Sequence, residues 1–224
     1  MMTRKPGNLP AVVNISVKTI FVRVTQGGKH EKKQKSSCKC SGSYDVRIAW
    51  SLQRQYIQAD KVAKLIDDIY VQERTDDTDE QCKAAKEAWD ALTDEQKELV
   101  EGENADPDYF GRDTGDASLD DPRNQDEIGD KEILVVSFGT SFNDSRVKDI
   151  KSIEDSIQDA FPDWAVRRAF TAQIIINHVE ARDGECIDNM DQALERAVEN
   201  GVKELVVQPT HLMHGAEYDE MVEA

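Results

Sequence analysis

Apolar positions in the C-terminal part of the chain fall into short runs separated by stretches with helical spacing. The runs Ile133–Val136 and Leu205–Val207 are rich in β-branched residues, which is typical of strands buried on both faces of a parallel sheet. Between them, residues 164–170 indicate another strand. Helices are predicted where apolar residues recur three and four apart, in 150–160, 171–183 and 189–200. This alternation predicts an α/β fold, a parallel sheet flanked by helices.

The part of the chain before this fold predicts a small helical accessory segment. Residues Val62, Leu65, Ile66 and Ile69 have the spacing of one helical face. Two further helices are predicted to begin at capping boxes, in which a threonine oxygen accepts from a backbone N–H group and a glutamine reaches back. These boxes are Thr78–Gln81 and Thr93–Gln96.

Changes in composition divide the chain into four predicted regions. They are a basic, poorly ordered head (1–54), a small helical module (55–102), an acidic linker (103–130) and an α/β lobe truncated at its C-terminus (131–224). The linker carries 10 acidic residues and is expected to bury little. This division predicts that residues 1–130 can be deleted without changing any chemistry of the lobe.

Charge is spread unevenly and excludes one class of partner. Residues 1–54 carry 11 Lys and Arg against 2 Asp and Glu, whereas residues 55–224 carry 17 against 43. An acidic body argues against nucleic acid, which requires clustered cations. No apolar run is long enough to span a membrane. The four cysteines lack the spacing of a metal framework and are interpreted as ordinary thiols.

The loop after the first predicted strand, Ser137–Ser141, combines hydroxyl groups with a glycine ahead of a helix. Free N–H groups and the positive end of a helix favour an anion there, for example the carboxylates of a ligand. The alternative is a turn in which Asn143, Asp144 or Ser145 caps the helix.

His211, His214 and Glu217 lie three residues apart, just beyond the end of the strand at Leu205–Val207. Ligands of open α/β sheets bind at this edge. Histidine suits divalent transition metals, and a carboxylate can share such a site. The alternative is a plain turn at His214-Gly215, with the histidines as capping or core groups.

Four ordered motifs resemble the anaerobic sirohydrochlorin cobaltochelatases, the CbiK family of class II chelatases. They are Ile133–Arg146, Val166–Ile176, Arg182–Gly184 with Ile187-Asp188, and Val206–Tyr218. The resemblance implies one of two similar α/β lobes between which the tetrapyrrole lies. It also implies insertion of Co²⁺ into sirohydrochlorin without ATP, in anaerobic cobalamin biosynthesis. The metal is a substrate, with Fe²⁺ or Ni²⁺ as alternatives, and no organic cofactor is expected.

Site residues follow from the resemblance position by position. Glu217 matches the family's active-site glutamate and His211 a histidine of the same motif, so both are expected to be catalytic. His211, His214 and Glu217 are the expected metal ligands, although His214 matches only some members. The tetrapyrrole is expected to contact four residues of the first loop, Ser137, Gly139, Thr140 and Ser141. The family's two principal histidines lie in C-terminal motifs that this sequence lacks.

Three interpretations of function stay open at this point. The first is a sirohydrochlorin cobaltochelatase, working as a homodimer or with a separate C-terminal lobe. The second is a catalytically incomplete half-chelatase that binds tetrapyrrole or metal without turnover. The third is a scaffold whose acidic 103–130 segment binds cations weakly. The lack of a signal sequence predicts a cytoplasmic location, and an extracytoplasmic one is the alternative if the true N-terminus carries a signal.

Overall fold

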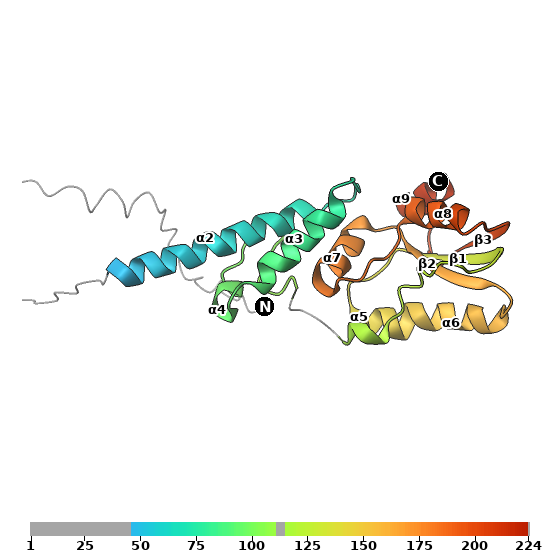
Figure 1. Cartoon of the computed structure of the whole chain (residues 1–224), viewed down its shortest axis with the longest axis horizontal. Coiled ribbons are helices and arrows are strands. Elements are labelled where there is room, and N and C mark those ends of the chain that lie inside the picture. The colour runs from blue at the N-terminus through green and yellow to red at the C-terminus, as the bar shows by residue number, and fades with distance from the viewer. Residues whose placement is uncertain (1–45, 111–114, 224) are drawn as a thin grey trace, which may run out of the picture. The chain divides into compact units, whose positions relative to one another are not determined.

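The computed structural model describes residues 46–110 and 115–223 of the chain (Figure 1). Most of the basic head predicted for residues 1–54 therefore lies outside the described residues. Its last part, from Val46, belongs to a helix. One compact unit spans Tyr44–Ala224.

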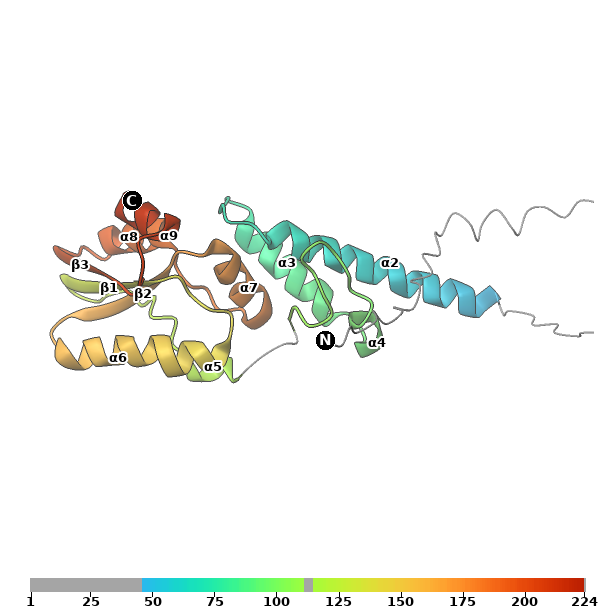
Figure 2. The ribbon, with the colours of Figure 1, turned by 180° about the vertical axis from the view of Figure 1, so that it is seen from behind.

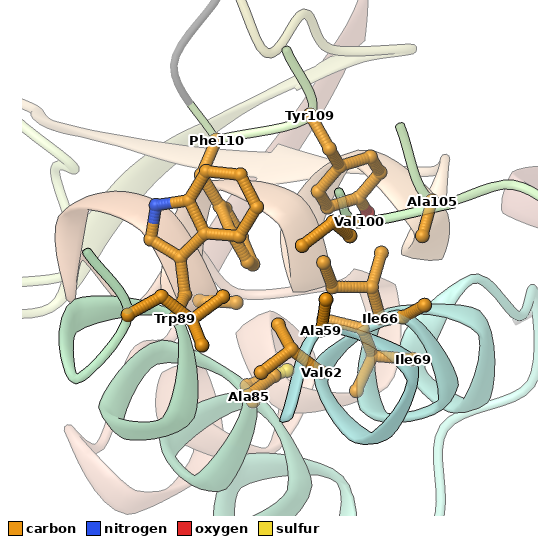
Figure 3. Packing of buried hydrophobic residues seen from close by; sticks show 14 residues of the cluster. Ala59, Val62, Ile66, Ile69, Ala85, Trp89, Val100, Ala105, Tyr109 and Phe110 are labelled. Carbon is orange, nitrogen blue, oxygen red and sulfur yellow. The ribbon is translucent and has the colours of Figure 1, made fainter. Parts of the chain in front are cut away.

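A helical hairpin forms the N-terminal half of this unit. It consists of α2 (Val46–Ile69) and α3 (Thr78–Asp90), followed by the short α4 (Asp94–Lys97). Apolar faces of the two long helices meet in one core, closed by Val100 and by the aromatic rings of Trp89, Tyr109 and Phe110 (Figure 3). Burial of these faces, rather than helix propensity, holds such a hairpin together.

Of the two predicted capping boxes, one is confirmed and one is wrong. Thr93 accepts from Gln96 N, and the Gln96 side chain accepts from Thr93 N. At α3, however, Asp77 occupies the cap position and makes no side-chain cap. Thr78 instead turns its hydroxyl back to accept from Thr75 N at 2.9 Å, so it caps the preceding turn.

The segment predicted as a linker takes part in the packing. Ala105, Tyr109 and Phe110 are buried in the hairpin core. The carboxylate of Asp67 on α2 accepts from three successive backbone N–H groups, those of residues 103–105, and ties the start of the segment down. Farther on, a short 3-10 turn, η1 (Ala117–Leu119), precedes Asp120, whose side chain is fully buried.

The C-terminal half contains a parallel sheet with strands in the order β2-β1-β3, which confirms the predicted α/β fold. The strands are β1 (Lys131–Ser137), β2 (Ala165–Phe170) and β3 (Glu204–Pro209). Its helical elements are α5 (Asn143–Ser145), the π-helical η2 (Arg146–Ile150), α6 (Lys151–Ala160), α7 (Gln173–Asp183), α8 (Met190–Glu199) and α9 (Ala216–Glu223).

Helices lie on both faces of the sheet (Figures 1 and 2). On one face, Ile133 and Val135 of β1 pack with Ile157 of α6. On the other, Leu134 and Val136 pack with α8 and with Met221 of α9. Successive side chains of β1 thus point to opposite faces of the sheet and pack against the helices on each face, as expected for a strand buried on both faces.

The prediction that Leu205–Val207 forms a strand is confirmed, but the prediction that this strand is buried is wrong. These three residues are 38%, 45% and 38% exposed. β3 is an edge strand, and among the described residues it pairs only with β1. An apolar sequence shows what a strand would bury; it does not show whether anything covers it.

Helix α7 joins the hairpin to the sheet. Gln72, in the loop after α2, accepts from Gln173 N at the start of α7, and Asn177 donates to Ile69 O at the end of α2. The ring of His178 stacks on Tyr109 at 4.2 Å. Ile176 and Val179 of α7 pack with Phe170 of β2, and Ala181 of α7 packs into the hairpin core. Helix α7 is therefore buried on two sides.

Candidate functional site

Three loops at the carboxyl ends of the strands are hydrogen-bonded to one another. Thr171, after β2, donates from its backbone N–H to Ser137 O at the end of β1. Thr210, after β3, donates from its hydroxyl to Ser137 Oγ at 2.8 Å and from its N–H to Val136 O. Ser137 is therefore the common partner that fixes the loops after β2 and β3 relative to the loop after β1.

His211 lies at this junction. Its Nε2 is 3.3 Å from Thr171 Oγ1, and which of the two atoms donates depends on the tautomer. Its Nδ1 is buried, and no residue in the described part of the chain offers it a hydrogen bond. The imidazole is thus held through one nitrogen while the other has no protein partner among those residues.

Tyr218 of α9 connects the two predicted histidines. The ring of His214 stacks on it at 4.1 Å, and the ring of His211 meets it edge-on at 6.4 Å. Glu217 lies in the first turn of α9, where the positive end of the helix favours a carboxylate. Within residues 46–110 and 115–223, no three His, Cys, Asp or Glu side chains are grouped so as to hold a metal ion. The metal-ligand set His211, His214 and Glu217 therefore stays a prediction.

The loop Ser137–Ser141 has a shape that only glycine permits at its centre. Gly139 has φ +98°, and a Cβ atom there would lie 2.6 Å from the Phe170 ring. Thr140 accepts from Phe142 N and closes the turn. Phe142 itself is the cap residue of α5 and makes no side-chain cap. Ser145, at the cap position of η2, also makes no side-chain cap, so for Ser145 the capping alternative is not confirmed. Capping by Asn143 or Asp144 and the loop's role as a tetrapyrrole contact both stay predictions.

Large apolar side chains are exposed on two of these loops. Phe138 and Phe142 after β1 are each 45% exposed, and Leu212 and Met213, next to His211, are 100% and 80% exposed. Isolated exposed apolar residues are ordinary, but four on neighbouring loops around a histidine offer an apolar surface. Such a surface suits a flat hydrophobic ligand better than a hydrated ion.

A cavity of about 420 Å³ has Thr171, the hydrogen-bond partner of His211, in its wall. The start of α8 contributes Asn189 and Asp191, and α9 contributes Met221. The hairpin supplies three lining residues, Gln72, Glu73 and Arg74. Sequence reasoning missed both the threonines and this hairpin contribution. The threonines could have been found because each directly follows a predicted strand, whereas the hairpin contact depends on tertiary packing alone.

None of the described helices is both long and apolar enough to cross a membrane.

Comparison with known proteins matches the C-terminal half of the molecule. Residues 131–224 match the family model described as cobalt chelatase (CbiK). Over 92 residues, 41% of this chain, the sequence is 39% identical to the sirohydrochlorin cobaltochelatase of Salmonella typhimurium. The match covers 35% of that protein, so this chain corresponds to about a third of its length.

Proposed function

We propose that the chain is a sirohydrochlorin cobaltochelatase, because residues 131–224 match the cobalt chelatase (CbiK) family model and are similar to the Salmonella typhimurium enzyme. In this proposal it binds sirohydrochlorin against the loops after β1 and β3 and takes part in the insertion of Co²⁺. Metal and tetrapyrrole are both substrates, and no organic cofactor is involved.

One observation carries the proposal: His211, hydrogen-bonded to Thr171, lies next to exposed apolar side chains at the carboxyl edge of the sheet. Metal insertion requires the removal of two pyrrole protons as the ion leaves its water shell. A neutral imidazole is suited to accept such a proton. Phe138, Phe142 and Leu212 supply apolar surface for the flat face of the ring.

The hydrogen bond to Thr171 is linked to which nitrogen of the His211 imidazole carries the proton. When the Thr171 hydroxyl donates to Nε2, the imidazole carries its proton on Nδ1; when Nε2–H donates, Nδ1 is an acceptor. The Glu217 carboxylate, in the first turn of α9, is proposed to attract the cation or to accept the second proton.

A second candidate is a half-chelatase that binds tetrapyrrole without turnover. It is supported by the exposed apolar side chains of Phe138, Phe142 and Leu212, which offer a surface for a flat ring without requiring a bound metal. A homodimer or a separate C-terminal lobe is the partner that would convert this half-site into an enzyme.

Anaerobic absorbance spectroscopy separates the two candidates. Sirohydrochlorin is titrated with the protein, Co²⁺ is added, and the rate of spectral change is compared with the uncatalysed rate. A chelatase accelerates insertion, and His211→Ala and Glu217→Gln each reduce the rate at least tenfold. The matched control is Asp219→Asn, an exposed carboxylate of the same helix. Binding without acceleration supports the half-chelatase, and absence of binding refutes both.

A further inference from the structure

Arg146 is the first residue of the π-helical turn η2, and its side chain is completely buried. It follows α5, which in turn follows the loop that we assign to the tetrapyrrole. Its Nη1 donates to the backbone carbonyls of Thr140 and Ser141, at 3.4 and 3.3 Å. Arg182 of α7 donates to the same Ser141 carbonyl at 2.8 Å. Two guanidinium groups therefore hold the inner side of the loop.

These contacts determine which way the peptide groups of the loop face. In a trans peptide the C=O and N–H bonds point in opposite directions. Since the carbonyls of Thr140 and Ser141 point to the arginines, the N–H groups that follow them point away from the protein interior. One of these, Phe142 N, bonds to Thr140 Oγ1, which leaves the N–H of Ser141 aimed outward by the same arrangement.

A buried arginine needs a compensating charge, and for Arg146 the nearest one comes from outside the family match. Arg146 Nε donates to Asp120 Oδ2 at 3.0 Å, and both side chains are 0% exposed. Asp183 and Glu185 lie farther from Arg146, at 3.5 and 3.3 Å, and are partly exposed. Removing one partner of a buried pair leaves an uncompensated charge, which is strongly unfavourable.

Asp120 also holds a second arginine, Arg168 of β2. Arg168 donates to both oxygens of Asp120, at 2.8 and 3.0 Å, and is itself buried. Burial would raise the pKa of Asp120, but the hydrogen bonds and charges of Arg168 and Arg146 outweigh it and lower the pKa. One carboxylate thus connects the strand β2 to the arginine that shapes the loop.

We propose that Asp120 is a positioning residue for the loop Ser137–Ser141, acting through Arg146. This inference rests on the proposed tetrapyrrole-binding function and adds a residue from the predicted linker to it. It also reverses the expectation that residues 1–130 can be deleted without effect, because the carboxylate that neutralises Arg146 and Arg168 would be lost.

Amide hydrogen exchange of the loop tests the positioning role without any ligand. In Asp120→Asn, which keeps the shape and removes the charge, exchange of the peptide covering residues 138–142 is expected to rise at least tenfold, while α8 stays as in the wild type. The matched control is Asp155→Asn, a half-exposed carboxylate that pairs with Arg123 and Lys151 in the same region. It should leave the loop unchanged.

Two results would overturn the inference: unchanged exchange in the loop, or an equal rise in every segment, which means general destabilisation. If Asp120→Asn does not fold, Arg146→Lys takes its place. Lysine keeps the charge facing Asp120, but its single nitrogen cannot hold the carboxylate and both carbonyls with the geometry of the fork.

A sirohydrochlorin titration then separates this inference from the proposed function. If both hold, Asp120→Asn weakens binding at least tenfold, whereas Asp155→Asn binds as the wild type does. Wild-type protein that fails to bind sirohydrochlorin refutes the proposed function, while the exchange result still decides the positioning role. Equal binding by wild type and Asp120→Asn refutes the positioning of the binding loop.

Discussion

In the two strands that flank β1, burial is the opposite of what each sequence predicts. β2 contains two adjacent arginines, Arg167 and Arg168, yet both are completely buried. β3 contains the aliphatic run Leu205–Val207, yet it is more than a third exposed throughout. Both strands are parallel to β1 and pair with it residue for residue.

The difference comes from what lies beside each strand. Residues 120–125 run along the outer edge of β2, where Arg123 O accepts from Arg168 N and the Arg123 side chain donates to Val166 O. Carboxylates from three separate segments neutralise the two arginines of β2, namely Glu132, Glu154 and Asp120. Among the described residues, no strand pairs with the outer edge of β3. Burial therefore follows the available cover and not the hydropathy of the strand.

The largest effect is expected where the charge compensation in β2 is broken. Arg168→Met leaves Glu154 and Asp120 buried without their shared cation, so we expect a loss of about 3–5 kcal/mol in the free energy of unfolding. Gln208→Met is the matched control, because Gln208 and Arg168 lie on opposite sides of Val135 in the same register. It should change stability by less than about 0.5 kcal/mol. Urea denaturation followed by circular dichroism measures both, and equal losses would contradict the comparison.

A double substitution tests whether charge at β2 is needed at all. Arg167 pairs with Glu132 at 2.9 Å, but Arg167 Nη1 and Glu132 Oε2 are buried and lack partners among the described residues. Arg167→Met alone should cost about 3 kcal/mol, whereas Glu132→Leu combined with Arg167→Met should restore stability to near the wild-type value. A double-mutant cycle in urea gives the coupling, and additive losses would show that packing rather than charge decides.

Sequence reasoning succeeded where the signal is local. The strands and the order of the fold can be predicted from the spacing of apolar residues. It failed where distant segments decide, because the partners of Arg168 are Glu154 in α6 and Asp120 in the predicted linker. From the local sequence alone, two adjacent arginines predict an exposed segment, and an aliphatic run predicts a buried one.

The candidate site shows the same limit. His211 and the loop Ser137–Ser141 can be selected from the sequence because each follows an apolar run. The sequence cannot show that Ser137 connects Thr171 and Thr210, or that Gln72 from the hairpin lines the neighbouring cavity. These contacts join residues far apart in the chain and depend on packing that no local pattern encodes.

Glu180 of α7 faces another carboxylate, that of Asp79 in α3. Burial, together with the charge of Asp79 and a hydrogen bond between the two carboxyl groups, raises the pKa of Glu180 to about 7. The folded state then binds this proton more tightly than the unfolded state, whose pKa is near the ordinary 4.5. The stability that this proton contributes is present below pH about 4.5 and is lost as the pH rises through about 7.

Glu180→Gln should remove this pH dependence. We expect it to stabilise the fold by on the order of 1 kcal/mol at pH 8 and to change little at pH 5, because glutamine carries no charge to be repelled. Asp191→Asn serves as the control, because Asp191 is an acidic residue in the first turn of another helix, α8. Thermal unfolding at both pH values measures the difference, and a uniform gain at both would contradict the assigned cause.

We expect the smallest effect on stability from a substitution in β3 at the position that faces Ile133. The same substitution at the position of β2 that faces Ile133 should give the clearest difference between the two strands. Val206 of β3 and Val166 of β2 lie on the two sides of Ile133, 45% and 0% exposed. Val206→Lys should change the free energy of unfolding by less than about 0.5 kcal/mol, whereas Val166→Lys should prevent folding or cost several times more, since it buries an unpaired charge. Urea denaturation at low protein concentration makes the comparison.

The same Val206→Lys variant shows whether β3 is covered in solution. An exposed apolar edge strand is a template for pairing with another strand, and a lysine at such an edge opposes pairing. If a second copy supplies the cover, sedimentation equilibrium will show a dimer that dissociates at least tenfold more readily in Val206→Lys than in the wild type. The control Lys203→Gln, at the exposed start of the same edge, should leave the dimer intact. A wild-type monomer at all concentrations would mean that a second copy does not provide the cover.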